Sequence, residues 1–456
     1  MLVRSLAITI PIALVGVLSA HAQPVPTAAD FPGRKHSALE RMTLERARAA
    51  TEDAEKHQAG RQPVQLQSGY NDYHAILHAH AEDAAHTGGT REEMLEDAKK
   101  VGVDCIFLSN HFRPPEDFMD TWRGLHDGVL FIPGSETKGF IIHPMESMMD
   151  EMDLEGEEFI EAVTRDGGLI FLSHLEERFD HPVDGLTGIE IYNRHFDAIQ
   201  QRGVLFALPG ILMDPERYAE TRAALDAYPD AMFAMQCDYP VLYTAKWDEE
   251  TQHQRVVGIA ANDCHHNNVM LVTMVDEETV LLGTNVDTVD SMREFKADNH
   301  PGILEMTQGH EPGDIIAKLD FDPYYVSFMN SSTHILAAEL TEEAMRDALR
   351  EGRAYVSHDW LCDPSGFVFG AKREGEDEWA ALMGAEIPYE DGLTLLAEFP
   401  IECDIRLLKD GEEIFAGPGR EFSFTPDGPG VYRIEGWLHI DSEDRPWLYS
   451  NPVYLR

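Results

Sequence analysis

Short apolar runs alternate with amphipathic segments through the middle of the chain. From Val64 onward these runs are rich in β-branched residues, and each ends in a polar residue. The runs are VDCIFLSNH ending at His111, VLFIPGSE at Glu136, GLIFLSH at His174, GIEIYN at Asn193, and VVGIAANDCH at Asp263 and His265. Continuous apolar runs of this length are typical of strands buried on both faces, as in a parallel sheet.

Segments with helical patterns lie between these runs. Thr90 and Glu93 predict a capping box at the start of TREEMLEDAKKVG, and EEFIEAVTRDGG is apolar at helical spacing. Asp214 followed by Pro215 predicts the start of a helix over ERYAETRAALDAY. Alternating strands and helices predict an α/β fold with a parallel barrel or an open sheet. In a barrel the carboxyl ends of the strands line the active site, so we expect the polar residues above to converge.

The N-terminus has the pattern of a cleavable signal peptide, residues 1–22. Arg4 precedes the apolar run Leu6–Leu18, which is too short and too interrupted by Pro11 to span a bilayer. Ala20-His21-Ala22 matches an A-x-A cleavage site, which predicts a mature chain beginning at Gln23. No cysteine follows the site, so we expect no lipid anchor. The sequence therefore predicts a periplasmic or secreted protein.

The remaining organisation consists of an arm and two domains. Residues 23–63 are a Pro-rich linker followed by SALERMTLERARAATEDAEKHQAG, which predicts a charged helix. Residues 64–340 form the predicted α/β domain. In residues 341–456, a helix over TEEAMRDALREG precedes closely spaced segments such as DIRLLK, EFSFT and VYRIEGWLHI, with turn motifs KDGEE and TPDGPG between them. This pattern predicts an antiparallel β-sandwich.

Charge and cysteine content exclude several classes of function. The chain has 36 Lys and Arg against 82 Asp and Glu, a formal charge of −46. Such a charge repels nucleic acid and anionic membranes and disfavours a polyanionic substrate. The 5 cysteines among 456 residues are no disulfide framework. A Cys362–Cys403 disulfide is compatible with an oxidising compartment, and the sequence leaves it open.

Imidazole and carboxylate groups gather at the predicted strand ends. In His78-Ala79-His80 the alternation puts both rings on one face of an extended segment. A lone H-x-H is more often a pair of surface or core histidines, but an ordered set is a stronger indication. Such groups are ligands for Zn, Mn or Fe. The candidate metal ligands are His78, His80, His86, His111, Glu136, His143, His174, Asp263 and His265.

The order of these motifs resembles the PHP superfamily, named for polymerase and histidinol phosphatase domains. Between Tyr70 and His266 the chain contains H-x-H…H, SNH, GSE followed by a histidine, SH and NDCH. The resemblance implies a distorted (β/α)7-type barrel that holds two or three divalent ions (Zn, Mn or Fe). It also implies that a metal-bound hydroxide cleaves a phosphoester of a small molecule.

The resemblance further implies a distribution of ligands over the ions. One ion would be held by His78, His80, Glu136 and Asp263. Glu136 would bridge to a second ion, bound also by His86 and His111. A third site would comprise His143 and His174, supported by His80 or His265. Where many members have an acid, this chain has His86, which matches the trinuclear phosphatases and favours three ions.

Further roles follow for residues around these ligands. Asp263 is a pure ligand or a proton shuttle to the leaving group. Arg113 is a candidate clamp for a substrate oxyanion, and Arg194 and His195 stand at another strand end. We interpret Glu82 and Asp83 as orienting partners of the ligating rings. Cys264, between two ligands, is expected to be a packed thiol.

Other functions remain open at this stage. The C-terminal part is similar to exported PHP proteins that include hydrolases of carbamate esters such as carbaryl. Hydrolysis of a carbamate or carboxylic ester at the same metals is therefore the alternative activity. A non-catalytic, metal-stabilised binding protein is the alternative from another class, although closed structural zinc sites have about four ligands. The sequence does not predict the oligomeric state.

Overall fold

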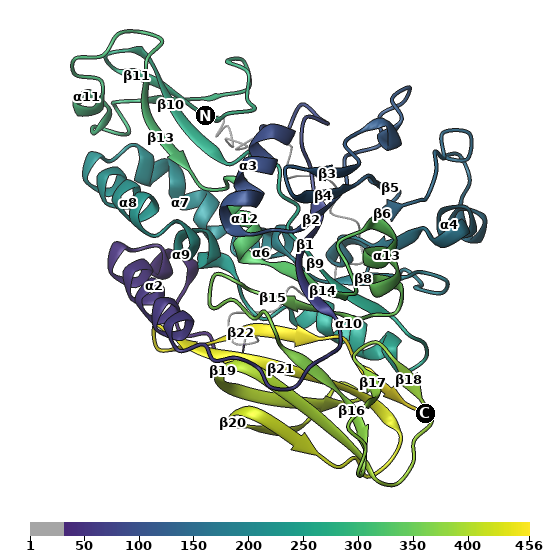
Figure 1. The fold of residues 1–456 in the computed structure, drawn as a ribbon. Helices are drawn as coiled ribbons and strands as arrows, with labels where there is room; N and C mark the ends of the chain where they lie inside the picture. Colours follow the sequence, from purple (N-terminus) through teal and green to yellow (C-terminus); the bar gives the residue numbers. More distant parts are fainter. Residues whose placement is uncertain (1–31) are drawn as a thin grey trace, which may run out of the picture.

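The computed structural model describes residues 32–456, in which a mixed α/β core adjoins a C-terminal region of long antiparallel strands (Figure 1). The predicted signal peptide and the predicted mature start at Gln23 lie outside the described residues. Among the described helices, none combines the length and the apolar character needed to cross a bilayer.

The helices predicted from capping and periodicity are present. In α3 (Arg91–Val101), Thr90 Oγ1 accepts from Glu93 N at 3.1 Å and Glu93 Oε2 accepts from Thr90 N at 3.0 Å. Gly102 ends this helix with a φ of 75°, which glycine adopts without strain. The other predicted helices are α4 (Gly156–Thr164), α8 (Pro215–Ala227) and α13 (Glu342–Arg350). The predicted N-terminal helix is divided at Thr43 into α1 (Ala38–Arg41) and α2 (Leu44–Ala59).

Two sheets form the core and meet at their ends. Their strands are β1 (Asn71–Ala79), β2 (Cys105–Leu108), β3 (Gly124–His126), β4 (Val129–Ile132), β5 (Ser135–Thr137), β6 (Phe140–His143), β7 (Leu169–Leu172), β8 (Gly188–Asn193) and β9 (Val257–Ala261). Strands β1, β2 and β4 are parallel neighbours, and the second sheet has the order β5-β6-β7-β8-β9. Isolated bridges join His111 to Glu136 and Ala79 to Cys264, which connects the two sheets at both sides. The ends of β1, β2, β7 and β9 therefore face a common centre.

The predicted parallel arrangement is wrong for strand β6. It runs antiparallel to both β5 and β7, because Lys138 and Gly139, with φ of 52° and 84°, reverse the chain in a tight hairpin. His143, at the carboxyl end of β6, is therefore paired with Leu169 at the start of β7. His174 follows the other end of β7. The core is α/β as predicted, but its sheet is mixed.

Short helices connect the second half of the core. They are α5 (Leu175–Arg178), α6 (Arg194–Gln200), α7 (Gly203–Leu212), α9 (Pro229–Phe233) and α10 (Val241–Thr251), with 3-10 helices η2 (Phe118–Asp120), η3 (Arg165–Gly167) and η4 (Ala234–Gln236). A four-stranded antiparallel sheet, which the sequence did not predict, follows β9. It consists of β10 (Val269–Asp276), β11 (Thr279–Thr284), β12 (Arg293–Lys296) and β13 (Ile315–Asp320), with α11 (Ile303–Met306) before β13 and α12 (Tyr324–Asn330) after it.

The C-terminal strands continue the first core sheet. They are β14 (Ser332–Ala337), β15 (Ala354–Ser357), β16 (Val368–Arg373), β17 (Trp379–Leu382), β18 (Glu386–Ile387), β19 (Leu393–Lys409), β20 (Glu412–Phe424), β21 (Gly430–Ile440), β22 (Glu443–Ser450) and β23 (Val453–Leu455). The order β17-β16-β19-β21-β22-β15-β14-β1-β2-β4-β3 crosses the predicted domain boundary at residue 340 without a break. Strand β19 pairs with β16 from Leu393 to Glu398 and with β21 from Asp404 to Lys409, and its pairing with β20 is irregular between Glu398 and Cys403.

Candidate metal centre

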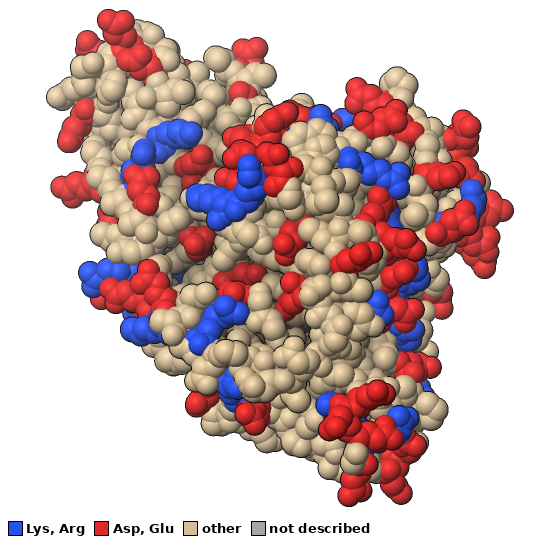
Figure 2. Space-filling model, viewed as in Figure 1, with Lys and Arg blue, Asp and Glu red and all other residues tan. Residues whose placement is uncertain are grey.

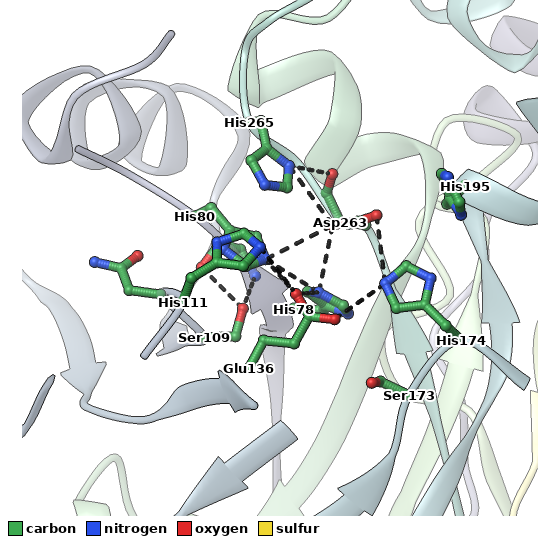
Figure 3. Close-up of polar contacts among 12 residues, drawn as sticks. His78, His80, Ser109, His111, Glu136, Ser173, His174, His195, Asp263 and His265 are labelled. Atoms are coloured by element: carbon green, nitrogen blue, oxygen red, sulfur yellow. Dashed lines mark hydrogen bonds and ion pairs between the residues drawn. The ribbon is translucent and has the colours of Figure 1, made fainter. Parts of the chain in front are cut away.

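The H-x-H motif occupies the end of β1 and the residue after it. His78 and His80 are both fully buried, and their Nε2 atoms lie 3.1 Å apart. The predicted alternation is present: both rings point to the same side, while Ala79 packs in the core on the other. Figure 3 shows both rings facing the centre.

The SNH motif fixes β2 against β1. Ser109 Oγ donates to Ala79 O at 3.0 Å and accepts from Ala79 N at 2.9 Å. The Asn110 side chain bonds to both backbone groups of Ala81, each at 3.1 Å. These side chains hold the two strand ends together, so the next residue, His111, lies beside the H-x-H segment.

Glu136 lies among four imidazoles. Its Oε2 is 3.4 Å from His111 Nε2, 3.6 Å from His80 Nε2 and 3.7 Å from His78 Nε2. Its Oε1 is 3.2 Å from His174 Nε2. One carboxylate thus joins histidines from three separate strand ends.

Asp263 closes the centre from the end of β9. Its Oδ1 is 3.4 Å from His78 Nε2, and its Oδ2 is 3.7 Å from His174 Nε2. Asp263 and His174 have φ of 48° and 50°. Such left-handed backbone costs on the order of 1–3 kcal/mol outside glycine and recurs at functional sites. Hydrogen bonds hold this strained backbone in place. Asn262, the residue before Asp263, donates from its side-chain Nδ2 to two backbone carbonyl groups near α12.

His265 offers a ring nitrogen that is buried without a partner. Its ring stacks on His80 with centroids 4.1 Å apart, and its Nδ1 lies 3.0 Å from Asp263 O. Its Nε2 is buried and has no hydrogen-bond partner among the described residues. A buried imidazole nitrogen normally has a partner, so this donor set fits a cation bound between His265, His80 and His111.

The structure brings together eight of the nine candidate ligands. Donor atoms of His78, His80, Glu136 and Asp263 lie within 4.8 Å of one another, as do those of His80, His111 and His265. The His86 ring lies beside the second group, with centroids 4.9 Å from His111 and 5.0 Å from His265.

The predicted convergence is wrong for His143. Its Nδ1 donates to Pro133 O at 3.2 Å and its ring packs against Phe107, with centroids 5.0 Å apart. Desolvation by burial, with the charge of Arg346, lowers its pKa to about 3. The antiparallel direction of β6 places this histidine at the opposite end of the sheet from His174.

Buried acids outside the ligand set orient the rings. Asp83 Oδ2 accepts from His80 Nδ1 at 3.0 Å and from His111 Nδ1 at 2.7 Å, which matches the role expected for it. The same expectation is wrong for Glu82, which pairs with Arg91 at 2.8 Å.

Glu190 is an orienting residue that sequence reasoning missed. It is fully buried in β8, accepts from His78 Nδ1 at 2.7 Å and accepts from the backbone N of His174 at 2.9 Å. A lone acid inside the apolar run GIEIYN was the pattern that would have identified it. Glu176, on α5, was also missed and contacts His174 Nδ1 at 3.2 Å.

Negative charge dominates the centre. Desolvation by burial lowers the pKa of His78, but the charges of Asp263 and Glu190 outweigh it and raise that pKa to about 10. Desolvation also raises the pKa of Asp263, but His78 and His174 outweigh it and lower that pKa to about 2. A site that draws positive charge this strongly, with only nitrogen and oxygen donors, suits Zn, Mn or Fe.

Arg113 and Arg194, the two candidate arginines from the sequence, lie in different surroundings. Arg113 is exposed on the loop after His111, and its charge acts with desolvation to lower the pKa of His86. Arg194 Nη2 donates to Gln236 Oε1 at 2.6 Å, and its guanidinium lies over the Phe233 ring. Arg113 is therefore at the rim of the centre, whereas Arg194 has partners of its own.

The cysteines take no part in the donor set. All five are free and buried, including Cys362 and Cys403, so the structure contains no bridge between these two. Cys264 packs in the core cluster that contains Ala79, as expected for a packed thiol.

Comparisons with known proteins give little further information. No protein-family model and no curated protein matches the chain. A solved structure from Bacteroides vulgatus, described as a two-domain protein containing a predicted PHP-like metal-dependent phosphoesterase, is 12% identical and has a TM-score of 0.29. The match covers 86% of this chain and 98% of that chain. Because a TM-score this low identifies neither fold nor activity, function must be inferred from the centre itself.

Proposed function

We propose that this chain is a metal-dependent hydrolase that cleaves phosphoesters of small molecules. The observation that carries the proposal is the approach of Nε2 atoms from His78, His80, His111 and His174 to within 3.2–3.7 Å of one carboxylate, Glu136. These residues come from distant parts of the sequence, and a shared cation site explains why their ring nitrogens meet.

Two groups of side chains would hold ions. His78, His80, Glu136 and Asp263 form one group, and His80, His111 and His265 form another beside His86. When bound, divalent ions lower the pKa of water toward neutrality and polarise the ester oxygen. Zn, Mn and Fe all accept these donors.

The chain's own residues would position the substrate and move the proton. In the net reaction water adds to phosphorus, the P–O ester bond breaks, and the alcohol leaves with a proton. Asp263 lies beside both His78 and His174, so its carboxylate is placed to move a proton from the attacking water to the leaving oxygen. Arg113, at the rim, is suited to bind a phosphoryl oxygen.

The proposal includes a PHP-type barrel. The ordered motifs that resemble this superfamily support it. So does the strand arrangement, in which β1, β2 and β4 of one sheet and β5 to β9 of the other surround the centre, with one isolated bridge between the sheets on each side.

The test is a substrate panel on the purified protein loaded with Zn²⁺ or Mn²⁺. We expect hydrolysis of p-nitrophenyl phosphate or a phosphodiester. Glu136→Gln should lose at least about 100-fold, because removing even an outer partner of a metal ligand costs about 10–100-fold and Glu136 would be a ligand itself. Glu146→Gln, an exposed acid after β6, is the matched control and should keep wild-type activity. Activity on p-nitrophenyl acetate or a carbamate alone would replace the phosphoesterase by the acyl hydrolase.

The proposal also includes export to the periplasm or the medium. It is supported by the apolar run Leu6–Leu18 and the A-x-A motif. N-terminal sequencing of the fractionated protein should give Gln23 as the first residue. Recovery of an intact N-terminus in the cytoplasmic fraction would contradict it.

A further inference from the structure

We propose that His195 is a metal ligand that holds a further divalent cation together with His174 and Asp263. This inference deepens the proposed function and rests on the same metal centre. It gives the centre a third cation position that does not require His143.

The three side chains already have the spacing of a cation site. One donor atom from each of His174, His195 and Asp263 lies within 4.8 Å of the other two. The rings of His174 and His195 are nearly perpendicular, at 86°, with centroids 5.1 Å apart. In Figure 3, His195 lies on the His174 side of the centre, away from His80 and His265.

Glu176 directs both rings at once. Its Oε1 accepts from His174 Nδ1 at 3.2 Å and from His195 Nδ1 at 3.0 Å. Each ring is thereby held through Nδ1, which leaves Nε2 available to a cation. The His174 Nε2 is already 3.7 Å from Asp263 Oδ2.

The same arrangement occurs on the opposite side of the centre. There, Asp83 holds the Nδ1 atoms of His80 and His111 with one oxygen. His80 and His111 belong to the second cation group. The two rings held by Glu176 are therefore held in the same way as two rings that lie in a candidate cation site. The resemblance between these two acid–histidine pairs distinguishes His195 from a surface histidine that only bonds to a nearby acid.

His195 is also anchored from behind. Tyr243 is fully buried, and its hydroxyl donates to Glu176 Oε2. Asn193 Oδ1 accepts from His195 N at 2.8 Å and fixes the first turn of α6. Anchored ring positions of this kind are typical of metal sites.

Charge balance favours a third cation. Five acids lie in or directly behind the centre: Asp83, Glu136, Glu176, Glu190 and Asp263. Two divalent cations leave one of these negative charges, whereas three leave one positive charge, which a bound hydroxide would neutralise. A centre without net negative charge does not repel a phosphoryl anion, as a protein with a formal charge of −46 otherwise would.

Metal content measures the inference directly. Protein stripped with chelator is dialysed against Mn²⁺ or Zn²⁺, gel-filtered, and analysed for metal per chain. Wild type should hold three equivalents, and His195→Ala and His195→Gln two. The glutamine variant keeps an amide that can bond to Glu176, and near-ultraviolet circular dichroism checks that each variant is folded. His253→Ala, an exposed histidine, is the matched control and should hold three.

A second variant tests the anchoring. Tyr243→Phe removes the hydroxyl behind Glu176 but no ligand. We expect it to bind three equivalents at saturation and to have about 10–100-fold lower affinity for one of them. Two equivalents in wild type, or equal metal content in wild type and folded His195→Gln, would overturn the inference.

The outcomes separate this inference from the proposed function. Hydrolysis of a phosphoester with no loss of metal in the His195 variants overturns the third position and leaves the phosphoesterase. Loss of one equivalent in those variants, with no phosphoester hydrolysis by wild type, supports the third position and overturns the phosphoesterase.

Discussion

Asp83 acts on the centre through the rings of other residues. Its Oδ2 accepts from His80 Nδ1, His111 Nδ1 and the backbone N of His111, at 3.0, 2.7 and 2.8 Å. Its second oxygen accepts from Thr87 Oγ1 at 2.5 Å. One buried carboxylate therefore sets the orientation of two rings and of the loop that carries one of them.

Asp83→Asn should weaken metal binding without removing a proposed ligand. The amide retains one accepting oxygen but loses the charge that strengthens both imidazole bonds. We expect metal affinity to fall by about 10–100-fold, measured by competition with a chromogenic chelator. Glu82→Gln, which changes the neighbouring acid that pairs with Arg91, should leave the affinity unchanged. Equal affinity in Asp83→Asn and Glu82→Gln would show that Asp83 does not position the rings.

At the scale of elements, the sequence predicts strand existence better than strand direction. Polar residues after apolar runs were identified because burial on both faces produces a continuous run, and eight of the nine candidates do meet. His143 was misplaced because the run FIIH contains no signal for the direction of β6. The antiparallel direction of this strand depends on the hairpin at Lys138 and Gly139.

Two of the orienting acids, Glu176 and Glu190, were missed for a different reason. Glu190 lies inside a strand and Glu176 on a four-residue helix, so neither occupies a strand end. Their role depends on tertiary contacts with His78 and His174, which have no counterpart in local periodicity. The sheet from β10 to β13 was missed because buried and exposed residues do not alternate strictly in β10 and β11, and neither strand ends in a candidate ligand.

The N-terminal helices are attached to the C-terminal strands by a buried ionic cluster. Arg41 donates to Glu443 at 2.9 and 3.1 Å and to Asp238 at 3.0 Å. Glu443 also accepts from two backbone N–H groups, of Lys35 and His36, at 2.7 Å each. Removing one partner of a buried pair is destabilising by about 3–5 kcal/mol, since the other charge stays buried.

Glu443 should make this attachment sensitive to acid. Desolvation raises its pKa, but Arg445 and Arg41 outweigh it and lower the pKa from 4.5 to about 2. Because the pKa is lower in the folded state, the stabilisation is complete above pH 4.5 and is lost as pH falls toward 2. At 1.36 kcal/mol per unit, this amounts to about 3 kcal/mol.

Denaturant unfolding of Glu443→Gln between pH 2 and pH 6 measures this contribution. The variant should be less stable than wild type by about 3 kcal/mol or more near pH 6, and the difference should shrink as pH falls below 4.5. Asp444→Asn, which changes an adjacent exposed acid paired with His439, should behave as wild type. A difference that stays constant down to pH 2 would exclude titration of Glu443 as its cause.

At the scale of the whole molecule, the sheet joins the two predicted domains. Strand β14 pairs with β1 on one side and with β15 on the other, and β15 pairs with β22. Asn451 adds contacts to β9, where its side chain bonds to both backbone groups of Gly258. The metal centre and the C-terminal strands thus share hydrogen bonds and core.

Such sharing predicts one cooperative thermal transition for the chain. Chelation should lower the transition temperature of the whole protein, because each ion stabilises the folded state by about 4 kcal/mol at a thousand times its Kd. Scanning calorimetry with and without EDTA measures both effects. Two separated transitions, of which only one responds to EDTA, would show that residues beyond 340 fold independently.

Acidic side chains are spread over the face shown in Figure 2 and outnumber the basic ones there. With a formal charge of −46, mutual repulsion favours the expanded chain. The Debye length falls from about 30 Å at 0.01 M salt to about 3 Å at 1 M, so added salt should relieve the repulsion. We expect the transition temperature to rise by several degrees over this range, equally in NaCl and choline chloride. A rise in NaCl alone would indicate bound Na⁺, and a fall in both would show that surface ion pairs outweigh the net charge.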